Sequence, residues 1–170
     1  MMRSLLRLAA LVVVAAISLQ LYFVLRIAAM VWIDPQSTTF QRSEIGRLWR
    51  ERGVVAWSQS WTPDAAIADT LKRAVIAAED AGFIDHGGID WEALERAWDR
   101  NQRAEAATQR RIGRGTASRA RPPKLVGGST ITQQLAKNLF LTGERTLPRK
   151  AQEFVITWTL EALLPKRRIL

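Results

Sequence analysis

An apolar segment near the N-terminus is the feature that most constrains this chain. Residues 8–25 carry no charge, and apolar residues continue beyond Arg26 to Ile33. A helix needs about 20 such residues to cross a bilayer, and here they surround the helix instead of forming one stripe, which disfavours a buried core helix. No convincing small-x-small cleavage site follows, so we expect an uncleaved signal-anchor. Because Arg3 and Arg7 precede the segment, we expect a cytoplasmic N-terminus and the remaining chain outside.

Composition removes several classes of function. The 170 residues include no Cys and one His, which excludes disulfide scaffolds, thiol nucleophiles and sites rich in Cys or His ligands. The formal charge is +9, which suits an anionic partner such as a membrane surface or a phosphorylated substrate. A domain outside the cytoplasm argues against nucleic acid. At 48% hydrophobic residues, the chain can bury a core.

We expect three parts: a cytoplasmic stub with its signal-anchor at 1–33, a linker leading into the domain at 34–67, and one all-helical domain at 68–170. No useful strand alternation occurs, and helical spacing begins at Ala68. Asp90 is a suitable N-cap for a second helix, as the capping box of Thr130 with Gln133 is for a third, and Pro148 suits the first turn of a fourth. The apolar stripes expected on these four helices are Leu71, Ala74, Val75 and Ala78; Ala93, Leu94, Ala97 and Trp98; Ile131, Leu135 and Leu139; and Ala151, Phe154, Val155, Trp158 and Ala162.

Residues 101–126 lose this periodicity. They contain seven basic residues and one acidic residue, a net charge of +6. We interpret them as a mobile basic loop beside the cleft, with a simple solvated connection as the alternative.

A few polar residues could carry chemistry. Glu79 ends an apolar helix, where partial desolvation would favour acid–base work near neutral pH, although a structural carboxylate is the simpler interpretation. His86 is more often structural than catalytic in such a position. Glu153 follows Arg149 and Lys150 at helical spacing, which indicates either a surface ion-pair cluster or, with further cations at Lys137 and Arg145, a site for a diphosphate. Residues 127–130, GGST, are not a nucleotide phosphate loop.

Three motifs occur in order: EDAGFIDHGG at 79–88, GGSTITQQLAKNLFL at 127–141 and RKAQE at 149–153. A fourth, KRRIL at 166–170, looks like the beginning of another motif. With these motifs the chain resembles the bacterial peptidoglycan glycosyltransferases, and most of all their monofunctional, membrane-anchored members. The resemblance extends over nearly everything from residue 34 onward and is weak before residue 68.

The resemblance implies a lysozyme-like helical fold and polymerisation of lipid II into glycan strands at the outer face of the bacterial inner membrane. Glu79 would be the general base, and Glu153 the second carboxylate, near the donor diphosphate. Lys137, Arg145 and Arg149 would hold that diphosphate. The residues implied to shape the cleft are Ser129, Thr130, Gln133, Gln134 and Asn138, and those implied to shape the site around Glu79 are Asp80, Phe83 and His86.

The resemblance implies no metal ligands, and it leaves open stimulation by Mg²⁺ or Mn²⁺. The expected partners are lipid II, the growing strand, membrane lipids and proteins of cell-wall synthesis or division. Three alternatives stay open: the glycosyltransferase part of a bifunctional penicillin-binding protein, a lysozyme-like lytic enzyme that uses Glu79 as a general acid, and a non-catalytic binder of anionic lipid. The family motif that begins at 166–170 continues with Glu-x-Tyr-Leu-Asn and further helices. We therefore expect this 170-residue chain to lack part of the cleft and to be a poor enzyme.

Overall fold

A computed structural model describes residues 2–55, 57–113, 127–144 and 146–170, and these residues form helices and connections without a strand. The expectation of an all-helical protein is confirmed. The elements in chain order are α1 (Met2–Ala29), α2 (Thr39–Arg52), the short 3₁₀ helix η1 (Asp64–Ala66), α3 (Asp69–Glu79), α4 (Trp91–Gly113), α5 (Ile131–Phe140), α6 (Leu147–Leu163) and α7 (Lys166–Ile169).

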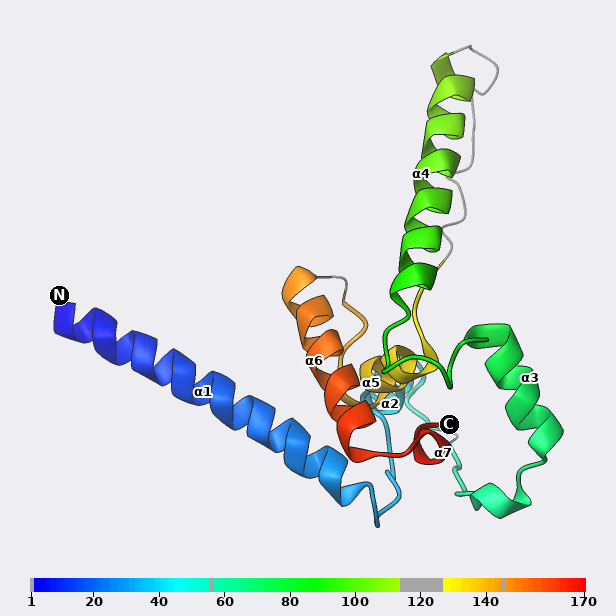
Figure 1. The fold of residues 1–170 in the computed structure, drawn as a ribbon. Coiled ribbons are helices and arrows are strands. Elements are labelled where there is room, and N and C mark those ends of the chain that lie inside the picture. The colour runs from blue at the N-terminus through cyan, green and yellow to red at the C-terminus, as the bar shows by residue number, and fades with distance from the viewer. Residues whose placement is uncertain (1, 56, 114–126, 145) are drawn as a thin grey trace.

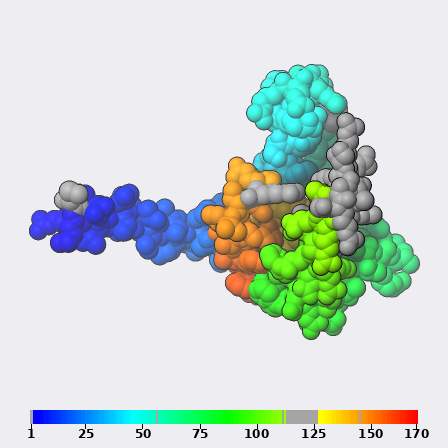
Figure 2. Space-filling view, turned by 90° about the horizontal axis from the view of Figure 1, so that it is seen from above, coloured from blue at the N-terminus to red at the C-terminus, as the bar shows by residue number. Residues whose placement is uncertain are grey.

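Helix α1 projects from the rest of the molecule (Figures 1 and 2), and within the described part of the chain it alone is long and apolar enough to cross a membrane. Its side chains are exposed from Met2 to Leu19. Beyond that point Phe23 and Ile27 are buried, and the Phe23 ring meets the Phe140 ring of α5 edge-on at 5.7 Å. The helix is therefore free over its first part and packed against the body over its last turns.

The core forms where α5 and α6 cross, with α1 and α7 packed around them. The buried residues shared by these helices are Phe23, Ile27, Met30, Phe83, Ala136, Leu139, Ile156, Leu160, Leu164 and Ile169. Arg168 of α7 donates to the Met30 carbonyl and to Asp34, at 2.8 and 2.7 Å, and so fixes the chain where it leaves α1.

The caps expected from the sequence form. Thr130 and Gln133 make the capping box of α5, Asp90 accepts from the Ala93 amide at 2.7 Å, and Pro148 lies in the first turn of α6. Within residues 34–67, expected as a linker, lies α2, which packs on α5 through a hydrogen bond from Thr39 to the Leu139 carbonyl.

Ion pairs connect α7 to the segment before α3. Asp64 accepts from Lys72 and Arg167, each at 2.7 Å. The hydrogen bond from Lys72, followed by that from Arg167, holds the pKa of the Asp64 carboxyl below its usual value.

The basic loop expected after the second helix of the domain needs a correction. Helix α4 continues to Gly113, so the loop expected at 101–126 is wrong for residues 101–113, while residues 114–126 lie outside the described part of the chain. The less exposed side chains of this stretch, Asn101, Ala104 and Thr108, still follow helical spacing. They are small or polar, so the stripe is invisible to a search for large apolar residues.

The stripe expected to bury α6 is also wrong. The buried residues of α6 are Glu153, Ile156, Thr157 and Leu160, whereas Val155 and Trp158 are 40% and 52% exposed. The core-facing side carries a carboxylate and a hydroxyl group, which concealed it in the sequence. The stripe of α3 is likewise exposed at Leu71 and Val75, both of which line an open cavity of ≈ 840 Å³.

Candidate active site

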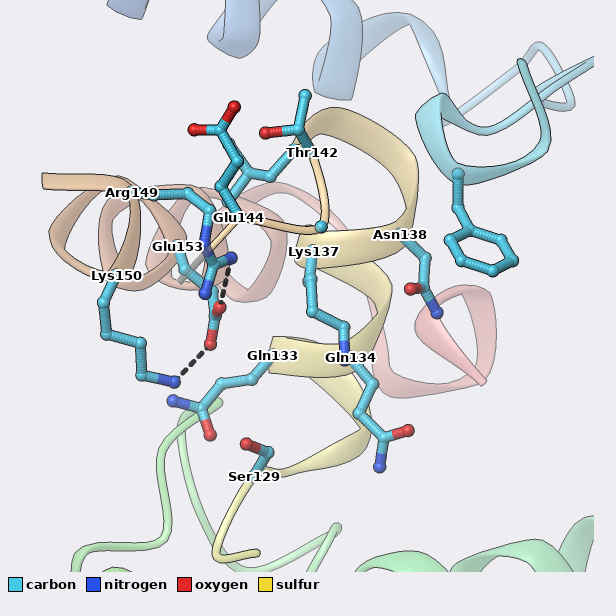
Figure 3. Close-up of a pocket in the computed structure, with 13 residues that line it drawn as sticks. Ser129, Gln133, Gln134, Lys137, Asn138, Thr142, Glu144, Arg149, Lys150 and Glu153 are labelled. Atoms are coloured by element: carbon cyan, nitrogen blue, oxygen red, sulfur yellow. Dashed lines mark hydrogen bonds and ion pairs between the residues drawn. The ribbon is translucent and has the colours of Figure 1, made fainter. Parts of the chain in front are cut away.

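A polar pocket of ≈ 340 Å³ lies between α5, the loop after it and the start of α6. Figure 3 shows its side chains. Helix α5 contributes one wall because Gln133, Gln134, Lys137 and Asn138 share the side that faces away from Leu135 and Leu139. The residues that line the pocket are Phe40, Ser129, Gln133, Gln134, Lys137, Asn138, Leu141, Thr142, Gly143, Glu144, Arg149, Lys150 and Glu153.

Glu153 is the buried carboxylate of this pocket, with 3% of its side chain exposed. Arg149 donates to one of its oxygens at 3.0 Å, and Lys150 donates to the other (Figure 3). Spacing of four and three residues on the first turns of α6 brings both cations to it. A buried carboxylate needs such partners, so the alternative of a surface cluster does not describe this one.

The cations of the pocket have capacity left for a ligand. Arg149 has a buried Nε that finds no hydrogen-bond acceptor among the described residues. Lys137 is exposed on the α5 wall and makes no hydrogen bond or ion pair with the described part of the chain. Arg145, expected to join them, lies outside the described residues. A cation without a counter-charge on the wall of a polar pocket, such as Lys137, favours an anion with several oxygens.

Glu79 lies beside the pocket and does not line it. It ends α3, it is exposed, and its Oε2 accepts from Nε2 of Gln134 at 3.0 Å. The expected partial desolvation of Glu79 is therefore wrong for this structure. Gln134 lines the pocket and donates to Glu79, so it holds Glu79 next to the α5 wall of the pocket.

A buried polar cluster lies beneath Glu79 and fixes the turn that follows α3. Asp80 accepts from the Ile131 amide at the start of α5 at 3.0 Å and lies 2.9 Å from Nε2 of His86. The hydroxyl of Thr130 donates to the Gly88 carbonyl at 2.6 Å. Phe83 is fully buried in the core. Asp80, Phe83 and His86 were expected to shape the site, and they lie between the end of α3 and the start of α5, on the side of the core.

Glu161, Lys166 and Thr132 were not expected as site residues, although Thr132 and Lys166 lie within the quoted motifs. Glu161 accepts from Thr132 at 2.5 Å and from Lys166 at 2.9 Å, and Lys166 also donates to the His86 carbonyl at 2.7 Å. The backbone comes close to this cluster at Gly88, where φ is +89° and a Cβ atom would lie 2.7 Å from Glu161. A glycine is required there on both counts.

Other pocket residues also escaped the sequence argument. Phe40 reaches the pocket from α2, and Leu141, Thr142, Gly143 and Glu144 come from the loop between α5 and α6. One signal in the sequence pointed to these four loop residues: they lie between two helices that both carry expected site residues. No group of three or more acidic or His ligands suited to a metal ion is present in the described part of the chain.

Comparison with known proteins places these residues in a family context. The transglycosylase family model matches residues 46–170. A biosynthetic peptidoglycan transglycosylase of Cupriavidus metallidurans is 44% identical over 172 residues, which cover 99% of this chain and 65% of the relative. Proteins of the same name from Burkholderia thailandensis and Bordetella pertussis are each 45% identical, over 91% and 88% of this chain. The chain spans 54% and 58% of the length of those two.

Proposed function

The chain belongs to the transglycosylase family, and on that premise we propose that it polymerises the glycan strands of peptidoglycan from lipid II. The observation that carries the proposal is the buried Glu153 held by Arg149 and Lys150, with a free Arg149 Nε beside it. A cleaving enzyme has no diphosphate to bind, so this cationic end of the pocket favours synthesis over the lytic alternative.

The proposed reaction is a single displacement at the anomeric carbon of the donor. The 4-hydroxyl oxygen of the acceptor sugar attacks that carbon from the face opposite the leaving group. A bond forms between the two, the bond from the carbon to the diphosphate oxygen breaks, and its electron pair goes to the diphosphate. Configuration inverts from α to β, and no covalent intermediate is needed.

Glu79 takes the proton of the attacking hydroxyl in this proposal. Its exposure is consistent with that role because the acceptor must reach it, and Gln134 holds it on the pocket side. A base in hydrogen-bond reach of the hydroxyl contributes typically 10²–10⁴-fold to such a step.

Lys137, Arg149 and Lys150 stabilise the charge that builds on the leaving diphosphate, with Arg145 as a further expected cation. Groups already oriented by Glu153 need no rearrangement as the charge develops, which is the main source of electrostatic catalysis. Ser129, Gln133 and Asn138 line the same pocket and would orient the sugar and diphosphate oxygens. Stimulation by Mg²⁺ or Mn²⁺ stays a proposal.

Helix α1 sets the location in this proposal. It would cross the bacterial inner membrane once, with the basic N-terminus in the cytoplasm and the catalytic domain in the periplasm. Lipid II and the growing strand would then be reached at the outer leaflet, alongside proteins of cell-wall synthesis or division.

The test is incubation with fluorescent lipid II in detergent, followed by electrophoresis of the products. It should use this chain, and also a chimera that continues beyond Leu170 with the remaining part of the Cupriavidus metallidurans relative. A ladder of polymers that the chimera forms, and that Glu79→Gln abolishes, is the expected result. A chimera that binds lipid II but releases only hydrolysed monomer would contradict the proposal.

A further inference from the structure

A partly buried ion pair lies behind the turn that follows Glu79, and the reaction proposed above does not use it. Glu161 of α6 and Lys166 of α7 bond at 2.9 Å, with 12% and 25% of their side chains exposed. Neither residue lines the polar pocket. A pair of this kind contributes little to stability by itself, because the desolvation of the two charges offsets much of their attraction. Its contacts with the turn suggest another role.

Lys166 contacts the turn at residues 80–88 in two places. Its Nζ donates to the His86 carbonyl at 2.7 Å, and it lies 4.5 Å from the centroid of the Phe83 ring. An ammonium group over an aromatic ring is attracted to it, in addition to the hydrogen bond. Figure 1 shows α7 below the connection between α3 and α4, of which this turn is a part. Lys166 therefore holds the turn at its middle and near its far end.

Glu161 keeps Lys166 in this position and also supports the turn directly. Its Oε1 accepts from the Thr132 hydroxyl of α5 at 2.5 Å and from Lys166 at 2.9 Å. The backbone of Gly88 lies so close that an added Cβ atom would be 2.7 Å from Cγ of Glu161. Helices α5, α6 and α7 and the end of the turn thus meet at one carboxylate.

The near end of the turn is fixed to α5 and lies next to Glu79. Asp80 accepts from the Ile131 amide at 3.0 Å, and one of its oxygens lies 2.9 Å from Nε2 of His86. Glu79 directly precedes Asp80, and within the described part of the chain its side chain is held by Gln134 alone. The position of the Glu79 carboxylate therefore depends on where the turn places the end of α3.

We propose that Lys166, oriented by Glu161, is a positioning residue for the reaction: it fixes the turn at residues 80–88 and so holds Glu79 where proton transfer requires it. Lys166 touches neither the substrate nor the reacting atoms. The inference rests on the role of Glu79 in the function proposed above. Displacement of a reacting group by about 1 Å can cost about 10²-fold in rate, so the support of this turn has a measurable effect.

Attachment of α7 to the protein is the competing role for Lys166. A helix of four residues does not hold itself together, and α7 is also attached through Arg168, which donates to the Met30 carbonyl and to Asp34. The Arg168 side chain is 27% exposed, close to the 25% of Lys166, but it bonds the chain where it leaves α1 and not the turn. Attachment of α7 and support of the turn can therefore be separated by experiment.

Two double variants without a lone charge make this separation. Lys166→Met with Glu161→Gln removes the support of the turn, and in the chimera described above it should lower kcat on lipid II by about 10–100-fold with KM unchanged. Arg168→Met with Asp34→Asn is the matched control on the same helix, and it should keep the kcat of the parent. Thermal unfolding shows whether the two double variants are equally stable, so that a loss of stability is not mistaken for a loss of positioning.

Hydrogen exchange follows the turn itself and needs no activity. The Gly88 amide bonds to Nδ1 of His86, and exchange at residues 80–88 of the 170-residue chain should become faster in Lys166→Cys. The chain has no native cysteine, so 2-bromoethylamine selectively alkylates the introduced thiol and rebuilds an ammonium group on a side chain as long as that of lysine. This treatment should restore slow exchange, whereas the uncharged ethyl group added by iodoethane should not.

Several outcomes would overturn the proposal. One is a parent-like kcat in Lys166→Met with Glu161→Gln, and another is an equal loss of kcat in the matched control. A third is exchange at residues 80–88 that Lys166→Cys leaves unchanged, or that both alkylations restore. A parent chimera that forms no polymer, with exchange changed as expected, would contradict the reaction proposed above, and the role of Lys166 in that reaction would fall with it.

Discussion

The two carboxylates proposed to take part in the reaction lie in opposite environments. Glu153 is buried and held by Arg149 and Lys150, while Glu79 is exposed and held by Gln134 alone. In the proposed reaction, charge develops at the Glu153 end and a proton moves at the Glu79 end. Under that proposal, the difference teaches that one end of the site is organised before the substrate arrives, and the other stays accessible to an incoming hydroxyl.

This comparison predicts that the two acidic residues fail in different ways. A change at Glu79 should affect the reaction and leave the fold intact. A change at Glu153 should affect the fold as well, because its partners lose their counter-charge inside the protein.

The largest effect is expected for Glu79→Gln. The amide keeps the hydrogen-bonding reach toward Gln134 but cannot accept a proton, so the polymerisation rate should fall by about 10²–10⁴-fold. The measurement is the initial rate on fluorescent lipid II in the chimera described above, with thermal unfolding as the control. A rate within a few-fold of the parent would remove Glu79 from the mechanism.

Glu153→Ala should produce the next largest effect, seen in stability. Removal of one partner of a buried pair costs about 3–5 kcal/mol, and we expect the lower end, about 3 kcal/mol, because the Lys150 side chain is 36% exposed. The matched control, Glu79→Ala, should change stability by less than about 0.5 kcal/mol, as is usual at exposed positions. Thermal unfolding followed by circular dichroism measures both, and equal losses would erase the contrast between the two carboxylates.

Binding of the diphosphate leaving group tests the cations of the pocket independently of the carboxylates. Lys137→Ala and Arg149→Ala should each weaken binding of undecaprenyl diphosphate by about tenfold, since a hydrogen bond to a charged group contributes about 1.5–3 kcal/mol. Arg100→Ala, at another cation on α4, is the control and should bind normally. If both pocket variants bind as tightly as the parent, these two cations do not hold the diphosphate.

The smallest effect is expected for Asp64→Asn, far from both carboxylates. The folded-state pKa of Asp64 is depressed by Lys72 and Arg167, so its stabilising contribution is present above the ordinary pKa of an aspartate and is lost as pH falls through the lowered value. The variant should unfold at a slightly lower temperature than the parent at pH 7. The difference should vanish in strong acid, and a constant difference at every pH would show that charge is not its cause.

Local signals in the sequence were enough to predict where α4, α5 and α6 begin, whereas α2 and the second half of α4 were missed. Asp90, Thr130 and Pro148 act within one turn of their own position, so their effect does not depend on the rest of the fold. The same is true of the pairing of Arg149 and Lys150 with Glu153 at helical spacing.

Which side of a helix faces the core could not be predicted in this way. In α6 the core receives Glu153 and Thr157 together with Ile156 and Leu160, whereas Val155 and Trp158 remain exposed. The position of Phe40 in the pocket depends on α2 packing across α5, a contact between segments 100 residues apart. The exposure of Glu79 likewise depends on where α3 lies relative to α5.

The packing of α1 also limits how freely this protein could be rebuilt. Phe23 and Ile27 of α1, and Met30 just after it, belong to the core, so the last turns of this helix are part of the body of the protein. An exchange of the helix before Gln20 for a foreign membrane span would leave the domain intact. An exchange through Met30 would remove core side chains, and therefore α1 and the rest of the protein are not modules that evolution or an engineer can recombine at the end of α1.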